Sequence, residues 1–186
     1  GVLSSGLYKE EDLSILIDIG TNGEIALGNK DFLVACAASA GPAFEGSGVS
    51  SGMRAASGAI QKVRINPKNF TVTSLTIGDT KPRGICGSGY IDLVSQMLEA
   101  GVIDRSGKIK IENHERVRNT DGKKEFVVVF KEDSGTTGDI VINEADIENL
   151  KRAKAAIYSA TAVLVKHMDF KLADVKKIFI AGGFGT

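Results

Sequence analysis

The sequence predicts a mixed α/β fold, in which helices flank a mixed β-sheet. Two observations lead to this class. Short apolar runs alternate along the chain with longer segments of helical periodicity. Two of the apolar runs, one near each end, stop at glycine-rich turns, as strands do when they lead into a loop. A chain of 186 residues is a plausible single domain.

The first element is predicted over residues 13–17, a short apolar run that fits a strand covered on both faces. It leads into Asp18-Ile19-Gly20-Thr21-Asn22-Gly23-Glu24. The pair Asn22-Gly23 is the strongest short-range signal for a two-residue hairpin turn, so residues 24–27 are expected to return as the second strand. Taken alone, this stretch fits an ordinary β-hairpin and a phosphate-binding loop equally well.

The residue types in this turn suit the binding of an anion. Gly20 and Gly23 would let the backbone approach a bulky phosphate, where a Cβ would collide with it. Thr21 and Asn22 offer side-chain donors, and Asp18 could hold a hydrated magnesium ion or orient a water molecule.

The middle of the chain continues the alternation. Residues 32–36 are expected to form a third strand, and residues 70–77 show the two-residue period of a half-buried strand. Between them, residues 37–58 are rich in glycine but carry regularly spaced apolar side chains. This favours short helices packed closely against the sheet over a flexible linker.

A further glycine motif, Gly87-Ser88-Gly89, precedes a predicted helix that ends at Gly101. Ser88 is the expected N-cap, and Ile91, Val94 and Leu98 are expected to form its apolar face. Free N–H groups at such a helix start can bind an anion. Close packing of the helix against the sheet would explain the same glycines, and both readings remain open at this stage.

The last third of the sequence predicts a hairpin, a long helix and a final strand. Residues 109–130 fit a hairpin that turns at Asp121-Gly122, with a charged edge strand around residues 114–119. Residues 140–142 form a short strand, after which Asn143 and Asp146 are placed to cap a helix of about 25 residues. An apolar run at residues 178–181 then meets Gly182-Gly183-Phe184-Gly185, which would allow close approach to a flat or charged ligand.

Composition limits the partners that the sequence favours. Lys and Arg number 23, and Asp and Glu also number 23, so no overall field attracts nucleic acid or an anionic membrane. Cys36 and Cys86 are too few and too far apart for a metal cage, and neutral thiols in a reducing cytoplasm are expected. No window of 18 apolar residues and no signal-peptide pattern occur. A cytoplasmic location without nucleic-acid or membrane partners is therefore expected.

Taken together, the glycine motifs resemble the superfamily of acetate and sugar kinases, Hsp70 and actin (ASKHA). The resemblance is closest to the ATPase domain of the ferredoxin-like reductive activators of corrinoid-dependent methyltransferases. Six blocks carry it in the same order: residues 16–25 (LIDIGTNGEI), 39–46 (SAGPAFEG), 52–55 (GMRA), 84–89 (GICGSG), 153–157 (AKAAI) and 181–185 (AGGFG). The resemblance implies an actin-like, RNase H-like ATPase lobe.

The resemblance also implies roles for these residues, with ATP and Mg²⁺ as the cofactors. Asp18 would be the catalytic and metal-binding residue, ordering magnesium or the attacking water. The other residues implied to bind the nucleotide are Gly20, Thr21, Asn22, Gly23, Glu24, Gly87, Ser88, Gly89, Gly182, Gly183, Phe184 and Gly185. Of these, Gly182, Gly183 and Gly185 would lie against the adenosine.

Members of this family carry an N-terminal iron–sulfur domain and a first phosphate loop, and this sequence contains neither. We therefore expect residues 1–186 to be a single domain, the second lobe of a two-lobed ATPase, inactive by itself. The intact protein is expected to couple ATP hydrolysis to electron transfer from its iron–sulfur cluster to a cobalt(II) corrinoid protein, and a homodimer is one expected state. A small-molecule kinase of the same superfamily and a non-catalytic docking lobe are the alternatives.

Overall fold

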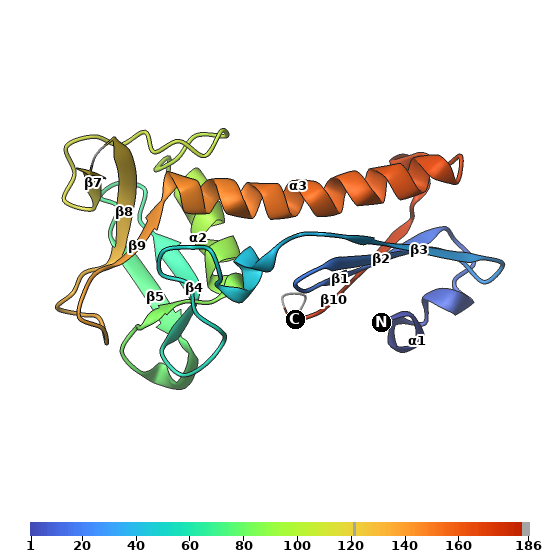
Figure 1. The fold of residues 1–186 in the computed structure, drawn as a ribbon, viewed down its shortest axis with the longest axis horizontal. Helices are drawn as coiled ribbons and strands as arrows, with labels where there is room; N and C mark the ends of the chain where they lie inside the picture. The colour runs from blue at the N-terminus through green and yellow to red at the C-terminus, as the bar shows by residue number, and fades with distance from the viewer. Residues whose placement is uncertain (121, 184–186) are drawn as a thin grey trace. The chain divides into compact units, whose positions relative to one another are not determined.

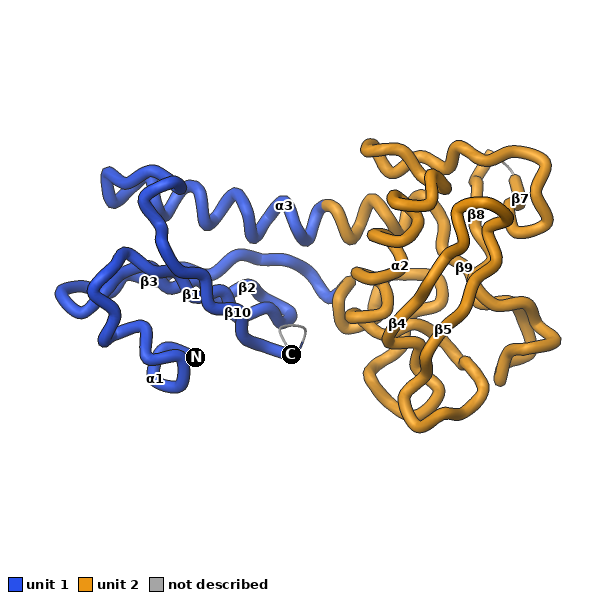
Figure 2. Tube along the Cα trace, turned by 180° about the vertical axis from the view of Figure 1, so that it is seen from behind, with its two compact units in different colours: residues 1–42, 152–186 blue, residues 43–151 orange. Residues whose placement is uncertain are grey.

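The computed structural model describes residues 1–120 and 122–183, and it contains two compact units (Figures 1 and 2). Unit 1 comprises residues 1–42 and 152–186, and unit 2 comprises residues 43–151. Helix α3 (Glu144–His167) begins in unit 2 and ends in unit 1. The mixed α/β class is confirmed, while the assignment of all 186 residues to a single domain stays a prediction.

Unit 1 is built on a four-stranded sheet with the order β10-β1-β2-β3 (Figure 1). Strands β1 (Ser14–Ile19), β2 (Gly23–Gly28) and β3 (Leu33–Ala38) form an antiparallel meander. Strand β10 (Lys177–Ala181) pairs with β1 in parallel. The sheet is mixed, as the sequence predicts, and the parallel pair brings together segments from opposite ends of the chain.

Different elements cover the two faces of this sheet. On one face the second half of α3 packs closely, and the Sγ atom of Cys36 lies 4.0 Å from the carbonyl oxygen of Ala160. On the other face a small buried cluster is supplied partly by the N-terminal elements α1 (Val2–Ser5) and η1 (Leu7–Lys9). Its members are Leu7, Leu16 and Ala26, with Val2, Phe179 and Ala181 packed against them.

The hairpin between β1 and β2 is present, but its predicted turn is wrong. Gly23 is the first residue of β2 and pairs with Ile19, so the loop has three residues, Gly20, Thr21 and Asn22. The N–H of Gly20 donates to the carbonyl oxygen of Asn22 at 2.9 Å and closes this loop. A Cβ on Gly23 would stand 2.7 Å from a side-chain carbon of Ile157 in α3. Gly23 therefore serves close packing of the helix on the sheet.

Unit 2 contains two three-stranded sheets, with the orders β5-β4-β6 and β7-β8-β9. The charged strand β7 lies at an edge, as its composition predicts. Asp121 of the predicted Asp121-Gly122 turn lies outside the described residues. The bounds of these strands are Ala59–Ile65 (β4), Val72–Thr76 (β5), Gly84–Ile85 (β6), Val117–Thr120 (β7), Lys123–Val129 (β8) and Ile140–Asn143 (β9).

Strand β6 pairs with only the first part of one edge of β4, and helix α2 (Gly87–Glu99) packs along the rest of that edge. Within residues 1–120 and 122–183, β4 has no strand neighbour along this edge beyond Ile60. The side chains of α2 replace that neighbour: Asp92 Oδ2 accepts the N–H of Val63 at 2.6 Å, and Gln96 Oε1 accepts the N–H of Ile65 at 3.3 Å. Two backbone donors are thereby satisfied without a strand.

The predicted start and face of α2 differ from those in the structure. The N-cap is Cys86, so Ser88 is the second residue inside the helix. The buried face is formed by Tyr90, Leu93 and Met97, whereas the predicted face members Ile91 and Leu98 are 45% and 47% exposed. The error in the face arises because a helical period has several nearly equivalent phases in this segment, and packing against β4 selects one of them. The predicted end is confirmed, since Gly101 has a φ of +75° directly after the C-cap.

The N-terminus of α3 carries the predicted reciprocal cap. Asn143 Oδ1 accepts the N–H of Asp146 at 2.9 Å, and Asp146 Oδ2 accepts the N–H of Asn143 at 3.0 Å. The other carboxylate oxygen of Asp146 accepts the N–H of Ser50 at 2.9 Å. This buried carboxylate therefore fixes both the helix start and a distant loop, and the second contact was not predicted.

That loop belongs to the glycine-rich segment, residues 37–58, in which short helices were expected. Only the turn η2 (Pro42–Glu45) is helical, and bends and turns form the rest of the segment beyond β3. Its position is set by hydrogen bonds: Ser51 Oγ accepts the N–H of Val141 at 2.9 Å, and Asn149 Nδ2 donates to the carbonyl oxygen of Gly48 at 2.9 Å. The remaining short 3-10 turns are η3 (Ile77–Asp79) and η4 (Leu172–Asp174).

Candidate functional site

The parallel pairing of β10 with β1 brings the two predicted glycine loops of unit 1 together. Asp18 is the register partner of Ala181, so the residue after β10, Gly182, lies beside the end of β1. A Cβ on Gly182 would stand 2.2 Å from the carbonyl oxygen of Ile19 and 2.8 Å from Asp18 Oδ1. Gly182 also has a φ of +90°, which favours glycine. Both the backbone conformation and the contact therefore require glycine here.

Asp18 and Glu24 form a pair of carboxylates on one face of the sheet. They are directly opposite each other on the antiparallel strands β1 and β2, where side chains stand about 4.5–5.5 Å apart at Cβ. Asp18 is half-buried and Glu24 is exposed. Like charges in this arrangement repel each other unless a cation lies between them. A divalent cation between the two carboxylates would relieve this repulsion.

A cavity of about 260 Å³ lies beside these carboxylates, on the sheet face opposite α3. Apart from Asp18 and Glu24 its walls are mostly apolar, and all of its lining residues belong to unit 1. The other lining residues are Gly1, Val2, Leu16, Ile25, Ala26, Ala35 and Cys36. Asp18 and Glu24 are the acidic side chains among the described residues that line this cavity, and they would favour a cationic ligand group.

The three-residue loop beside the carboxylates is open to a ligand. Thr21 and Asn22 are exposed, and a Cβ on Gly20 would meet only the carbonyl oxygen of Asn22, at 3.7 Å. A Cβ on Gly183 would meet nothing within 4 Å. A methyl-sized group would therefore be tolerated at both positions. The binding roles of Gly20, Thr21, Asn22, Gly23, Glu24, Gly182 and Gly183 stay predictions, and Phe184 and Gly185 lie outside the described residues.

The third glycine motif lies in unit 2, at the start of α2. A Cβ on Gly89 would stand 2.1 Å from the carbonyl oxygen of Ile60, so this glycine is required for packing against β4. Ser88 is exposed, and its hydroxyl lies 3.3 Å from the Sγ of Cys86. The packing explanation therefore accounts for Gly89, and nucleotide binding by Gly87, Ser88 and Gly89 stays a prediction.

The cysteines of this chain are both free thiols. Cys36 is half-buried, and desolvation raises the pKa of its thiol. The thiol of Cys86 is buried and donates to the carbonyl oxygen of Ile60 at 3.2 Å. Within residues 1–120 and 122–183, no group of three or more His, Cys, Asp or Glu side chains is arranged to hold a metal ion. A divalent cation at Asp18 and Glu24 would thus need ligands from water or from a phosphate.

In the part of the chain that the structure describes, no helix is both long enough and apolar enough to cross a membrane. The charged residues of the longest described helix, α3, lie in its first half and at its C-terminal end.

Residues 12–186 match the family described as the C-terminal domain of RACo, the ASKHA domain. Among curated proteins, the chain is 36% identical over 190 residues to a corrinoid activation enzyme, RamQ, of Eubacterium limosum. It is 26% identical over 205 residues to a [Co(II) methylated amine-specific corrinoid protein] reductase of Methanosarcina barkeri. These alignments cover 97% and 100% of this chain, but 32% and 34% of the two relatives.

A solved structure titled reductive activator for corrinoid,iron-sulfur protein has the same fold. It shares 50% sequence identity with this chain at a TM-score of 0.91, covering 99% of this chain and 30% of that one. The chain thus spans about one third of the length of the relatives it matches. The family match, which extends over nearly all of the sequence, confirms the resemblance carried by the glycine motifs: the chain belongs to the family of RACo C-terminal ASKHA domains.

Proposed function

We propose that this chain is the nucleotide-binding part of a reductive activator, in which ATP hydrolysis supports electron transfer to a cobalt(II) corrinoid protein. The observation that carries the proposal is the meeting of Gly182 with Asp18 and Ile19 at one end of the unit 1 sheet. An ASKHA domain implies nucleotide binding, and the names of the relatives point to corrinoid activation.

The chemistry required of the residues beside β1 is positioning and charge neutralisation, because phosphoryl transfer depends mainly on these two effects. The exposed loop at Thr21 and Asn22 offers N–H and side-chain donors to phosphate oxygens. Asp18 and Glu24 would hold a hydrated Mg²⁺, which keeps several waters and needs only one or two carboxylates. The bound ion would supply neutralisation of the phosphate charge.

The redox part of the activity would come from outside these residues. Transfer of one electron from a reduced iron–sulfur cluster to cobalt(II) gives cobalt(I), and ATP hydrolysis would drive this unfavourable step. We assign the cluster to an N-terminal domain of the intact protein, which is consistent with the chain spanning about one third of its relatives. The corrinoid protein is the proposed partner, and the homodimer stays part of this proposal.

The test is Asp18→Asn in the full-length parent protein. We expect ATP hydrolysis and ATP-dependent cobalt(I) formation, followed by absorbance, to fall about 100-fold or more, because one of two carboxylates at the phosphates is lost. Asp31→Asn is the matched control, since Asp31 is exposed in the loop between β2 and β3. Turnover within twofold of wild type for Asp18→Asn would refute the assignment. A phosphorylated small-molecule product without cobalt reduction would favour the kinase alternative.

A further inference from the structure

The hairpin formed by β4 and β5 carries a concentrated positive charge in a chain that is neutral as a whole. Residues 54–83 contain six basic residues and one acidic residue. Lys62 and Arg64 alternate with buried Val63 and Ile65 along β4, so both cations project from the exposed face of the hairpin. Lys68 adds a third cation in the turn that joins the two strands.

These cations lack the partners that neutralise other basic residues of unit 2. Lys108, Arg118, Lys124 and Lys151 each lie within 4.0 Å of an acidic side chain. By contrast, among the described residues no salt bridge forms at Lys62, Arg64 or Lys68. The exposed face of the hairpin therefore has unbalanced charge that an acidic surface could complement.

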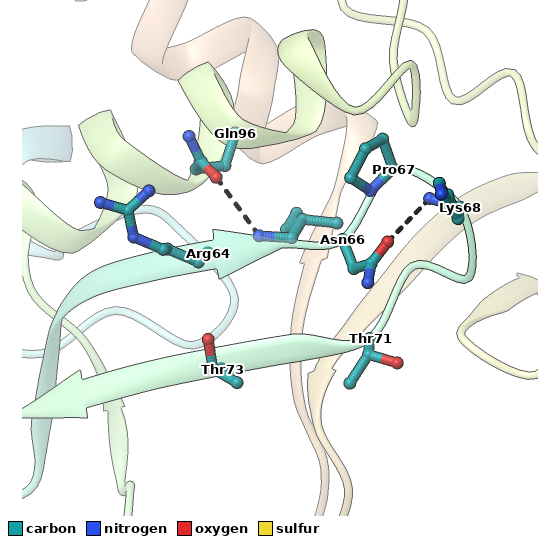
Figure 3. Close-up of a pocket in the computed structure, with 8 residues that line it drawn as sticks. Arg64, Asn66, Pro67, Lys68, Thr71, Thr73 and Gln96 are labelled. Carbon is teal, nitrogen blue, oxygen red and sulfur yellow. Dashed lines mark hydrogen bonds between the residues drawn. The ribbon is translucent and has the colours of Figure 1, made fainter.

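A cavity of about 560 Å³ adjoins this face, between the hairpin and α2 (Figure 3). Arg64 and Thr73 face each other across the two strands, and Pro67 and Lys68 form the turn beside them. Most of the lining side chains are exposed. A small ligand is normally buried over most of its surface, so an exposed groove of this kind fits a second protein better than a cofactor.

We propose that this hairpin face is the docking surface for an acidic patch on the corrinoid protein. The inference rests on the proposed function, which requires such a partner. Because the chain as a whole is neutral, a local positive face attracts an acidic partner to one part of the surface. It thereby orients the corrinoid protein as the two proteins approach each other. Hydroxyl groups of Thr71 and Thr73 and the exposed side chain of Leu75 provide uncharged contacts around the cations.

The experiment compares full-length wild-type protein with Lys62→Glu/Arg64→Glu, using corrinoid iron–sulfur protein as the partner. We expect the Kd for the partner, measured by calorimetry without ATP, to rise about tenfold or more at low salt, with basal ATP hydrolysis unchanged. Arg105→Glu/Lys110→Glu is the matched control, because it makes the same charge change at two other exposed residues of unit 2. Lys62→Gln/Arg64→Gln provides a milder variant should the double reversal impair folding.

A Kd within twofold of wild type in both hairpin variants would overturn the proposal, and so would an equal loss in the control. Binding of single-stranded DNA or anionic vesicles, but not of the corrinoid iron–sulfur protein, would overturn it as well. If the wild-type protein binds the partner but forms no cobalt(I) with ATP, the proposed function fails. A selective loss of binding in the hairpin variants would then still support the docking surface.

Discussion

At the scale of single residues, the glycines of this chain divide into those that pack elements together and those that leave space for a ligand. Gly23 and Gly89 each face a neighbouring element at a distance that excludes a Cβ. Gly20 and Gly183 have open space beside them. The motif at residues 18–24 contains both kinds, so the approach of a phosphate cannot explain all of its glycines.

Gly182 combines both requirements, and its replacement gives the sharpest test at this scale. We expect Gly182→Ala to weaken ATP binding by the full-length protein and to destabilise unit 1 by about 1–3 kcal/mol, because its φ of +90° is strained for alanine. The new Cβ would also force the loop away from Ile19 and Asp18. Calorimetric titration with a non-hydrolysable ATP analogue measures the affinity, and thermal unfolding measures the stability.

Gly183→Ala is the control for this substitution. Its Cβ would meet nothing within 4 Å, so the stability should remain near that of wild type, and Gly183→Ala serves as the control for stability alone because Gly183 is itself predicted to lie against the adenosine. If Gly182→Ala were as benign as Gly183→Ala, the close contact between the two loops would not exist in the protein.

At the scale of elements, the edge of β4 depends on side chains of α2 instead of a neighbouring strand. We expect Asp92→Ala to destabilise unit 2 by about 1–3 kcal/mol, because the N–H of Val63 loses its acceptor. Asp92→Asn keeps an acceptor oxygen and should lose less. Denaturant unfolding measures the difference in the free energy of unfolding, and hydrogen exchange of the β4 amides shows whether the loss is local to that strand. Equal stabilities for Asp92→Ala and for Ser95→Ala, at an exposed position of the same helix, would contradict this account.

At the start of α3, the stabilisation that Glu144 contributes should depend on pH. Partial burial of Glu144 acts to raise its pKa, but hydrogen bonds from Lys108 Nζ at 2.8 Å and the Ile109 N–H at 2.9 Å lower it overall. A lowered pKa in the folded state means that Glu144 contributes its full stabilisation above the ordinary value of 4.5. This contribution is lost as the pH falls through the folded-state pKa.

The measurement is the hydrogen-exchange protection of the Ile109 amide as a function of pH. In wild type we expect protection to decrease below about pH 4.5, as the carboxylate is protonated. Glu144→Gln should show weaker protection without this pH dependence, because glutamine does not titrate. Glu148→Gln, one turn further along α3, should behave as wild type does. An unchanged pH profile in Glu144→Gln would show that another group controls this contact.

The elements that the sequence predicts well are those specified by neighbouring residues. The reciprocal cap of Asn143 and Asp146 is visible as a spacing of three, and the strands of the first hairpin follow from their apolar runs. The phase of α2 depends on its packing against β4, and the place of Gly23 inside β2 depends on its pairing with Ile19 and its packing against Ile157. Local patterns contain no record of such contacts, which explains why both predictions failed.

At the scale of the whole molecule, the features that local sequence patterns do not specify depend mostly on contacts between distant segments. The resemblance to a family predicts that the glycine motifs at residues 18–24 and 182–185 bind one nucleotide, whereas the adjacency of Asp18 and Gly182 follows from the β1 and β10 register. The hydrogen bond from Ser50 to Asp146 spans 96 positions and has no sequence signal of its own. The resemblance supplied the predicted site residues, and the pairing of β1 with β10 places Asp18 beside Gly182.

The two units differ in whether they consist of one chain segment or two, and we expect this difference to affect folding. Unit 2 is one continuous segment, residues 43–151, whereas unit 1 needs residues 1–42 and 152–186 together. Truncation of the 186-residue chain after Phe170 removes β10, and with it the parallel partner of β1 and the contact of Phe179 with the Leu16 cluster. We expect unit 1 to lose its structure and unit 2 to keep its own.

Hydrogen exchange resolved by segment measures this outcome, with the intact 186-residue chain as the reference. Amides of α2 at Leu93 and Met97, which lie in the buried core of unit 2, should stay protected after truncation. Amides of β1 at Ile15 and Ile17 should exchange rapidly, because β1 then becomes an unpaired edge with an uncovered apolar face. Loss of protection in both units would mean that the continuous segment cannot fold without the discontinuous one. Retained protection in β1 would mean that the meander of β1, β2 and β3 holds the Asp18 and Glu24 pair without β10.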